Sequence, residues 1–248
     1  MGFFNRLFSS DEEEPSESQI RRAIKQVTQP HGEAANRVAA MQRLAEWRTP
    51  ESAAALLRRF TVQTPQASMD LEEKQYAVKL LTRMGEIAVN PIIAWLKTEP
   101  DVAHPIQALR KICSPEKYHA ALVEVLEALS TGYARWPEAK VVLIAGLDDE
   151  AFPRVGETVF RFLDDDNDDV CIAAIDYLTR NGGEAARDKL VQVYLAADGR
   201  PRVRGSILDH FHECNWGVGK YKKDVEAVIF PPFYLTAGGM VKRRGDGR

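Results

Sequence analysis

The sequence contains one cluster of His, Glu and Cys side chains that could bind a metal ion, at residues 210–214. His210 and Cys214 are four positions apart and would therefore share one face of a helix. A zinc site, however, needs a tetrahedral set of Cys and His ligands, and the sequence offers no second group to complete it. Cys214 also falls in a repeated apolar pattern. We therefore interpret this cluster as structural.

A second cluster, Asp164–Asp169, has acidic residues at alternate positions, as calcium-binding loops do. An EF-hand loop counted from Asp164 requires Gly at its sixth position and Glu at its twelfth, but Asp169 and Ile175 stand there. The Asp and Asn side chains are better suited to cap a helix that begins near Val170, because negative charge and side-chain oxygens stabilise a helix N-terminus. No calcium site is predicted.

The same acidic residues belong to a strongly charged stretch, since residues 148–169 have a local charge balance of −7. We consider two interpretations: solvated turns and helix caps, or a docking ridge for a basic protein partner. In the second interpretation, the acidic ridge consists of the following residues: Asp148, Asp149, Glu150, Asp164, Asp165, Asp166, Asp168 and Asp169.

Other signatures of chemistry are absent from the sequence. It has no Gly-rich phosphate loop, no GxSxG, no HExxH and no paired CxxC, so we predict no catalytic residue, no cofactor and no metal site. The net charge of −3 gives no global reason to bind nucleic acid. The cysteines, Cys113, Cys171 and Cys214, are odd in number and far apart, which indicates reduced thiols in the helix core and a cytoplasmic compartment.

The elements around these residues are helices that repeat along the chain. An apolar pattern at i, i+3 and i+6 recurs, for example at Met41/Leu44/Trp47 and Val78/Leu81/Met84, and strand signals are nearly absent. Its middle members are Leu44, Leu81, Leu109, Leu147, Leu178 and Phe211, and we call the residues in this pattern the seam. Each seam helix is followed by a second amphipathic stretch, such as ESAAALLRRF. A short helix pair cannot bury both apolar faces alone, so stacking of pairs into a solenoid is expected.

Three of these pairs carry a family resemblance: VAAMQRLAEW…PESAAALLRRF, YAVKLLTRMG…AVNPIIAWL and VCIAAIDYLTRNGGEAARDKLVQVY. They resemble HEAT repeats, including HEAT-like bacterial repeats. The basic residue that such repeats often carry early in their first helix has counterparts in Arg37, Lys74, Lys140 and Arg204, whereas Val102 and Cys171 depart from the pattern. The resemblance covers about residues 33–230 and specifies a fold far better than a function.

We therefore predict an all-α, right-handed α-solenoid of about six HEAT-like helix pairs within residues 16–230. Ser16 and Gln19 form a candidate capping box, which predicts an N-terminal capping helix. The resemblance implies a non-catalytic scaffold or adaptor for a protein partner. A HEAT-like enzyme remains the alternative, such as a DNA glycosylase or a bilin lyase. The second helices, which by analogy line the concave face, sum to only +1, and this argues against DNA.

The two ends of the chain differ from the repeats. Within residues 1–15, Phe3, Phe4, Leu7 and Phe8 have the spacing of a helix face, and Asp11–Glu14 follow. A two-turn helix is unstable alone, so we expect it to dock on a protein partner, on a membrane surface through residues 2–8, or on the first repeat. Residues 231–248 are predicted to be a basic, extended tail. Phe230 and the tail residues Phe233, Tyr234 and Leu235 are expected to cover the last helix pair.

Overall fold

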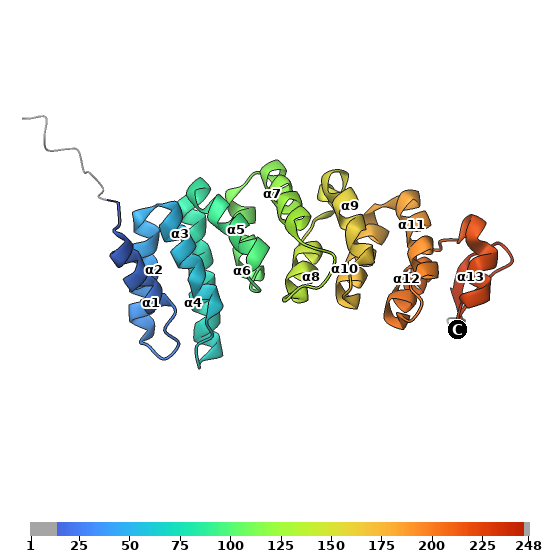
Figure 1. The fold of residues 1–248 in the computed structure, drawn as a ribbon, viewed down its shortest axis with the longest axis horizontal. Coiled ribbons are helices and arrows are strands. Elements are labelled where there is room, and N and C mark those ends of the chain that lie inside the picture. Colours follow the sequence, from blue (N-terminus) through green and yellow to red (C-terminus); the bar gives the residue numbers. More distant parts are fainter. Residues whose placement is uncertain (1–13, 246–248) are drawn as a thin grey trace, which may run out of the picture. The chain divides into compact units, whose positions relative to one another are not determined.

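The computed structural model describes residues 14–245, which are mostly helical, and successive helices pack against their neighbours (Figure 1). The predicted docking residues Phe3, Phe4, Leu7 and Phe8 lie outside the described residues. The chain divides into two compact units, Met1–Tyr118 and His119–Arg248. None of the helices within residues 14–245 combines the length and the apolar character needed to cross a bilayer.

The first unit consists of helices joined by short turns. They are α1 (Glu17–Val27), α2 (Ala34–Trp47), α3 (Pro50–Leu57), the 3₁₀ helix η1 (Arg58–Thr61), α4 (Ala67–Met84), the 3₁₀ helix η2 (Gly85–Ala88), α5 (Val89–Thr98) and α6 (Ala103–Ile112). Helix α7 (Pro115–Ala128) begins at the end of this unit. Contacts join α2 to α4, α4 to α6, and α3 to α5, so alternate helices of the sequence pack side by side.

The second unit repeats this arrangement and ends in a small sheet. Its elements after α7 are α8 (Pro137–Ala145), η3 (Asp149–Ala151), α9 (Phe152–Phe160), η4 (Arg161–Asp164), α10 (Asp168–Asn181), α11 (Gly183–Ala196), α12 (Pro201–Glu213), η5 (Gly219–Tyr221), α13 (Lys222–Val228), β1 (Phe233–Leu235) and β2 (Val241–Arg243). Helix α10 packs against α8 and against α12, and α11 packs against α13.

The seam forms the core of both units, as predicted. Leu44, Leu81, Leu109 and Leu178 are completely buried, and Phe211 is nearly so. The last position of the pattern is less uniform, since Met84 is buried whereas Trp47 and Ile112 are half-buried. Cys214 follows the last residue of α12 and is exposed, so the prediction that it fills the core is wrong. Cys171 does lie in the core, where its thiol donates to the carbonyl oxygen of Asp165 at 3.1 Å.

Local side-chain bonds set where several helices begin. The predicted capping box is present, because the Ser16 side chain accepts from the Gln19 backbone and the Gln19 side chain accepts from the Ser16 N–H. Thr49 and Ser52 cap α3 in the same way. The Asn167 side chain caps α10 by accepting from the N–H groups of Asp169 and Val170, as its position in the acidic stretch indicates.

The C-terminal segment is a β-hairpin, whereas the sequence predicted an extended tail. Strands β1 and β2 pair in antiparallel register, with Phe233 opposite Arg243 and Leu235 opposite Val241. Strand β2 packs against α12, and Val241 is completely buried. The prediction that apolar residues of this segment cover the last helices holds for Phe233, while Tyr234 is 40% exposed.

Candidate functional site

The first unit contains a buried cluster of charged side chains between α2, η1 and α4. The Arg37 guanidinium donates to both oxygens of Glu73, each at 2.8 Å. Arg59, which is completely buried, donates to Glu73 at 3.0 Å and to Asp70 at 2.7 Å. Burial alone would raise the pKa of Glu73, but the hydrogen bonds and charges of Arg37 and Arg59 lower it below its ordinary value.

The cluster continues through Lys74 toward the turn before α6. Its ammonium group lies 3.2 Å from Asp70 and 3.8 Å from Asp101, and Asp101 also bonds the Nδ1 atom of His104 at 3.0 Å. Each carboxylate of this cluster faces at least one cation, which for Asp101 is Lys74. The cluster therefore links α2 to α4, and α4 to the turn before α6. This assigns a structural role to Arg37 and Lys74, two of the basic positions that carry the HEAT resemblance.

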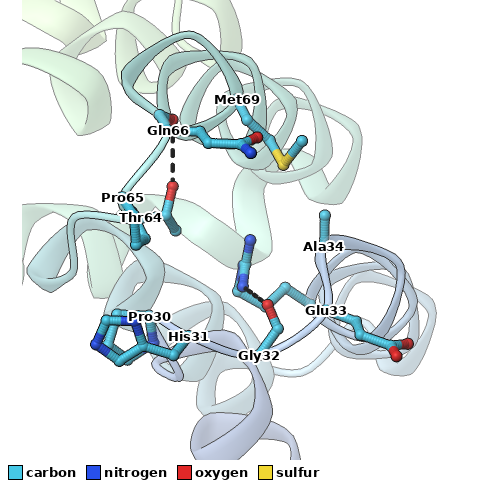
Figure 2. Close-up of a pocket in the computed structure, with 10 residues that line it drawn as sticks. Pro30, His31, Gly32, Glu33, Ala34, Thr64, Pro65, Gln66 and Met69 are labelled. Atoms are coloured by element: carbon cyan, nitrogen blue, oxygen red, sulfur yellow. Dashed lines mark hydrogen bonds between the residues drawn. The ribbon is translucent and has the colours of Figure 1, made fainter.

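A cavity of about 410 Å³ opens beside this cluster, between the turn before α2 and the start of α4. Figure 2 shows Pro30, His31 and Gly32 on one side of it, with Thr64 and Met69 on the other. Arg37 lies at its base but donates its Nη1 hydrogens to the carbonyl oxygens of Gln29 and Gly32. Since its other donors serve Glu73, this guanidinium has little capacity left for an anionic ligand.

In the second unit, ion pairs join three helices that run in the same direction. At their N-terminal ends, Lys140 of α8 contacts Asp165 just before α10, and Arg202 of α12 contacts Asp169 of α10. Near their C-terminal ends, Tyr177 of α10 donates to the Asp148 carbonyl oxygen just after α8. Burial raises the pKa of Tyr177 to about 12, so its hydroxyl stays protonated and remains a donor at neutral pH.

These ion pairs change the interpretation of the acidic ridge. Asp165 is buried and its carboxylate lies 2.7 Å from the Lys140 ammonium, so its assignment to a partner-binding surface is wrong. The reason is that Lys140 is also buried and needs a counter-ion. Asp168 pairs with Arg200, and Asp148 lies 3.0 Å from the His119 ring.

The remaining acids of the ridge are on the surface. Asp149 accepts a hydrogen bond from Asn181 at 3.1 Å and lies 3.9 Å from Arg180, and Asp169 is exposed although it pairs with Arg202. Glu150, Asp164 and Asp166 are exposed as well. The structure thus separates the eight predicted residues into buried or paired groups and a few surface carboxylates.

A groove of about 730 Å³ lies along α8, α10 and α12. Apolar side chains line it, and charged ones accompany them: Val141, Val142, Ala145, Ile172 and Ala173, with Glu138, Asp169, Asp176, Arg180 and His210. Val141, Val142 and Ile172 are partly exposed, and Ala145 is exposed. Apolar surface of this kind, bounded by charged groups, is typical of binding grooves. We define this set of residues as the α8–α10–α12 groove.

The His210 side chain, which can be protonated, contacts an acid within the groove. Its Nε2 atom lies 2.6 Å from an Asp176 carboxylate oxygen, across the gap between α12 and α10. That hydrogen bond raises the pKa of His210 against the opposing effect of burial, and the nearby acids Glu213 and Asp209 add to the increase. His210 therefore bridges two helices and shares no ligand role with Cys214. Within residues 14–245, no three His, Cys, Asp or Glu side chains gather in a metal-binding arrangement.

Sequence reasoning singled out Asp169 as part of the acidic ridge and His210 as a structural residue, but it did not predict the groove that they line. The signal was present in Val141-Val142 and Ile172, apolar positions just outside the seam of α8 and α10. Periodicity alone does not show whether such side chains are covered by a neighbouring helix. No protein-family model, curated protein or solved structure matches the chain.

Proposed function

We propose that the protein is a HEAT-like α-solenoid scaffold without catalytic activity that holds a protein partner in the α8–α10–α12 groove. The observation that carries the proposal is the groove's row of partly exposed apolar side chains, Val141, Val142 and Ile172, on helices held parallel by ion pairs. Rigid helices that present apolar surface to solvent are suited to binding a complementary helix or loop.

Two further observations support the scaffold assignment. The seam repeats in both units. A basic residue near the start of a seam helix also contacts an acid on, or just before, the next seam helix: Arg37 contacts Glu73, Lys74 contacts Asp101, and Lys140 contacts Asp165. This recurrence of one contact is the behaviour expected of stacked repeats. The thiols of Cys113, Cys171 and Cys214 are free, which supports a cytoplasmic location.

The proposal is tested by partner capture with matched variants. Wild-type protein and the Ile172→Gln variant are used as baits. The control bait is Leu71→Gln, because the Leu71 side chain is also apolar and 51% exposed but lies on α4 of the first unit. We expect Ile172→Gln to lose the captured protein while its circular dichroism spectrum is unchanged, and Leu71→Gln to retain it. Equal capture by all baits would contradict the proposed site.

A further inference from the structure

The loop between α7 and α8 presents aromatic side chains to solvent. Tyr133 is 87% exposed, and Trp136, the residue just before α8, is 41% exposed. The Arg135 guanidinium lies over the Trp136 ring, 4.9 Å from its centre. Tyr, Trp and Arg are the residue types that most often dominate the binding energy of protein interfaces. The loop therefore has the composition of a contact surface.

Hydrogen bonds fix this loop at one end of the α8–α10–α12 groove. The carbonyl oxygen of Thr131 accepts from the Asp166 N–H at 3.0 Å, and the carbonyl oxygen of Gly132 accepts from the Lys140 ammonium at 3.3 Å. Lys140 lies near the start of α8, and Asp166 lies just before α10. The loop is thus held where both helices begin, at the end of the groove that contains Glu138.

The same end of the groove has carboxylates that are available to a partner. Glu138 and Asp166 are exposed, and neither forms an ion pair with any residue between 14 and 245, whereas Asp169 pairs with Arg202. Arg180 lies in the last turn of α10, and α8 and α10 run in the same direction, so this cation is at the opposite end. From Asp169 to Arg180 the helix rises about 16 Å, at about 1.5 Å per residue. Apolar side chains line the interval between them.

We propose that the α8–α10–α12 groove binds a basic, amphipathic helix of a separate protein, with the helix's Arg or Lys residues against Tyr133, Glu138 and Asp166. The apolar face of that helix covers the apolar side chains of the groove. Cations suit this end because carboxylates pair with them and an aromatic ring attracts them. Repulsion by Arg180 disfavours the reverse orientation, so the charges fix the direction in which the helix lies. This inference rests on the proposed function, since it names the class of partner for the same groove.

Binding is measured with the full-length chain and two fluorescent helical peptides. Each peptide has about three turns, to match the length of the groove, with Leu along one face and Glu in its first turn. The basic peptide has two Arg residues in its last turn, and the control peptide has Gln in their place. We expect saturable binding of the basic peptide, seen as a rise in fluorescence anisotropy, with an affinity about tenfold higher than that of the control peptide. Ile172→Gln should weaken binding of both peptides by about tenfold, because both bury apolar surface there.

The contribution of the carboxylates is tested by a pair of matched variants. Glu138→Gln combined with Asp166→Asn should remove most of the preference for the basic peptide. The control combines Asp224→Asn with Glu226→Gln, because these are also exposed acids of the second unit but lie on α13, outside the groove. It should leave the preference unchanged.

The contribution of the aromatic ring is tested at Tyr133. Tyr133→Ala should weaken binding of the basic peptide by about two- to fivefold, as loss of an exposed cation–aromatic contact does. Tyr133→Phe should retain binding, since it keeps the ring. These variants and those of the carboxylates change exposed side chains, so they test the proposal even if Ile172→Gln fails to fold.

Three results would overturn the inference: equal or tighter binding of the control peptide, a preference that the Glu138/Asp166 and Asp224/Glu226 variants change equally, or a dimer in sedimentation that Ile172→Gln dissociates. The last result would make a second copy of the chain the occupant of the groove. Partner capture that depends on Ile172 would remain valid after either of the first two results. Capture that does not depend on Ile172 would instead contradict the proposed site itself, so the two failures are distinguishable.

Discussion

At the scale of single residues, the buried carboxylate of Glu73 is central to the first unit because it neutralises both Arg37 and Arg59. Replacing it with Gln leaves the buried Arg37 guanidinium without a counter-ion and leaves Arg59 with Asp70 alone. We expect Glu73→Gln to lower the free energy of unfolding by about 3–5 kcal/mol at neutral pH, as loss of one partner in a buried pair does. Glu99→Gln is the control, since the Arg58–Glu99 pair is partly exposed and worth at most about 1 kcal/mol.

The same residue gives a pH dependence whose sign follows from its lowered pKa. A carboxylate with a pKa below its unfolded value stabilises the folded state above the unfolded pKa, and this stabilisation is lost as the pH falls through the folded pKa. The stability difference between wild type and Glu73→Gln should therefore be largest at neutral pH and shrink below about pH 4. Chemical denaturation at several pH values measures it, and a difference that stays constant with pH would contradict the assignment.

Two neighbouring aspartates provide a second residue-scale prediction. Asp165 is buried against Lys140, whereas Asp166 is exposed. Asp165→Lys would place two ammonium groups together in a buried site, so we expect it to lower stability by several kcal/mol or to prevent folding. Asp166→Lys should change stability by less than about 0.5 kcal/mol, as surface substitutions usually do. Thermal melts of both variants make the comparison, and equal melting temperatures would show that Asp165 is not buried.

At the scale of helices, the seam predicts which leucines determine stability. Leu81 of α4 is completely buried, while Leu71 on the same helix is 51% exposed. Leu81→Ala should cost about 2–5 kcal/mol, because it removes buried methyl groups and leaves a cavity. Leu71→Ala should have a small effect, since it removes little buried surface. The two free energies of unfolding are compared by calorimetry; similar values would mean that the register of the seam is wrong.

The sequence predicted elements better than it predicted surfaces. Periodicity located the seam in both units, and capping chemistry located the start of α1 and of α10. These depend on neighbours within a few residues. The pairing of Asp165 with Lys140, 25 positions away, depends on how helices stack, and local sequence does not record it. The β-hairpin was missed for a related reason, because its strands are only three residues long and gain their stability by packing on α12.

At the scale of the whole molecule, ion pairs within each unit join neighbouring seam helices: α2 to α4 in the first unit, and α8 to α10 and α10 to α12 in the second. The sequence of residues 148–169, with a charge balance of −7, predicts a strongly acidic surface. Several of its acids pair, however, with cations from α8, α10 and α12 and with Arg200 just before α12. Most of these partners are more than 20 residues away in the sequence. These pairs offset part of the acidic charge of the stretch, which is why our proposal bases partner recognition on apolar contact in the α8–α10–α12 groove.

The N-terminal segment gives the last prediction at this scale. Helix α1 closes its own N-terminus through the Ser16–Gln19 capping box, and Ala23 and Val27 are buried, so we expect the first unit to fold without residues 2–10. Deleting them should change the melting temperature by no more than about 4 °C, which corresponds to about 1 kcal/mol in a chain of this size. A reversibly docked segment contributes a stabilisation of this order. A fall of 10 °C or more in differential scanning calorimetry would instead mean that these residues belong to the core, because losing four large apolar side chains from a folded cap costs several kcal/mol.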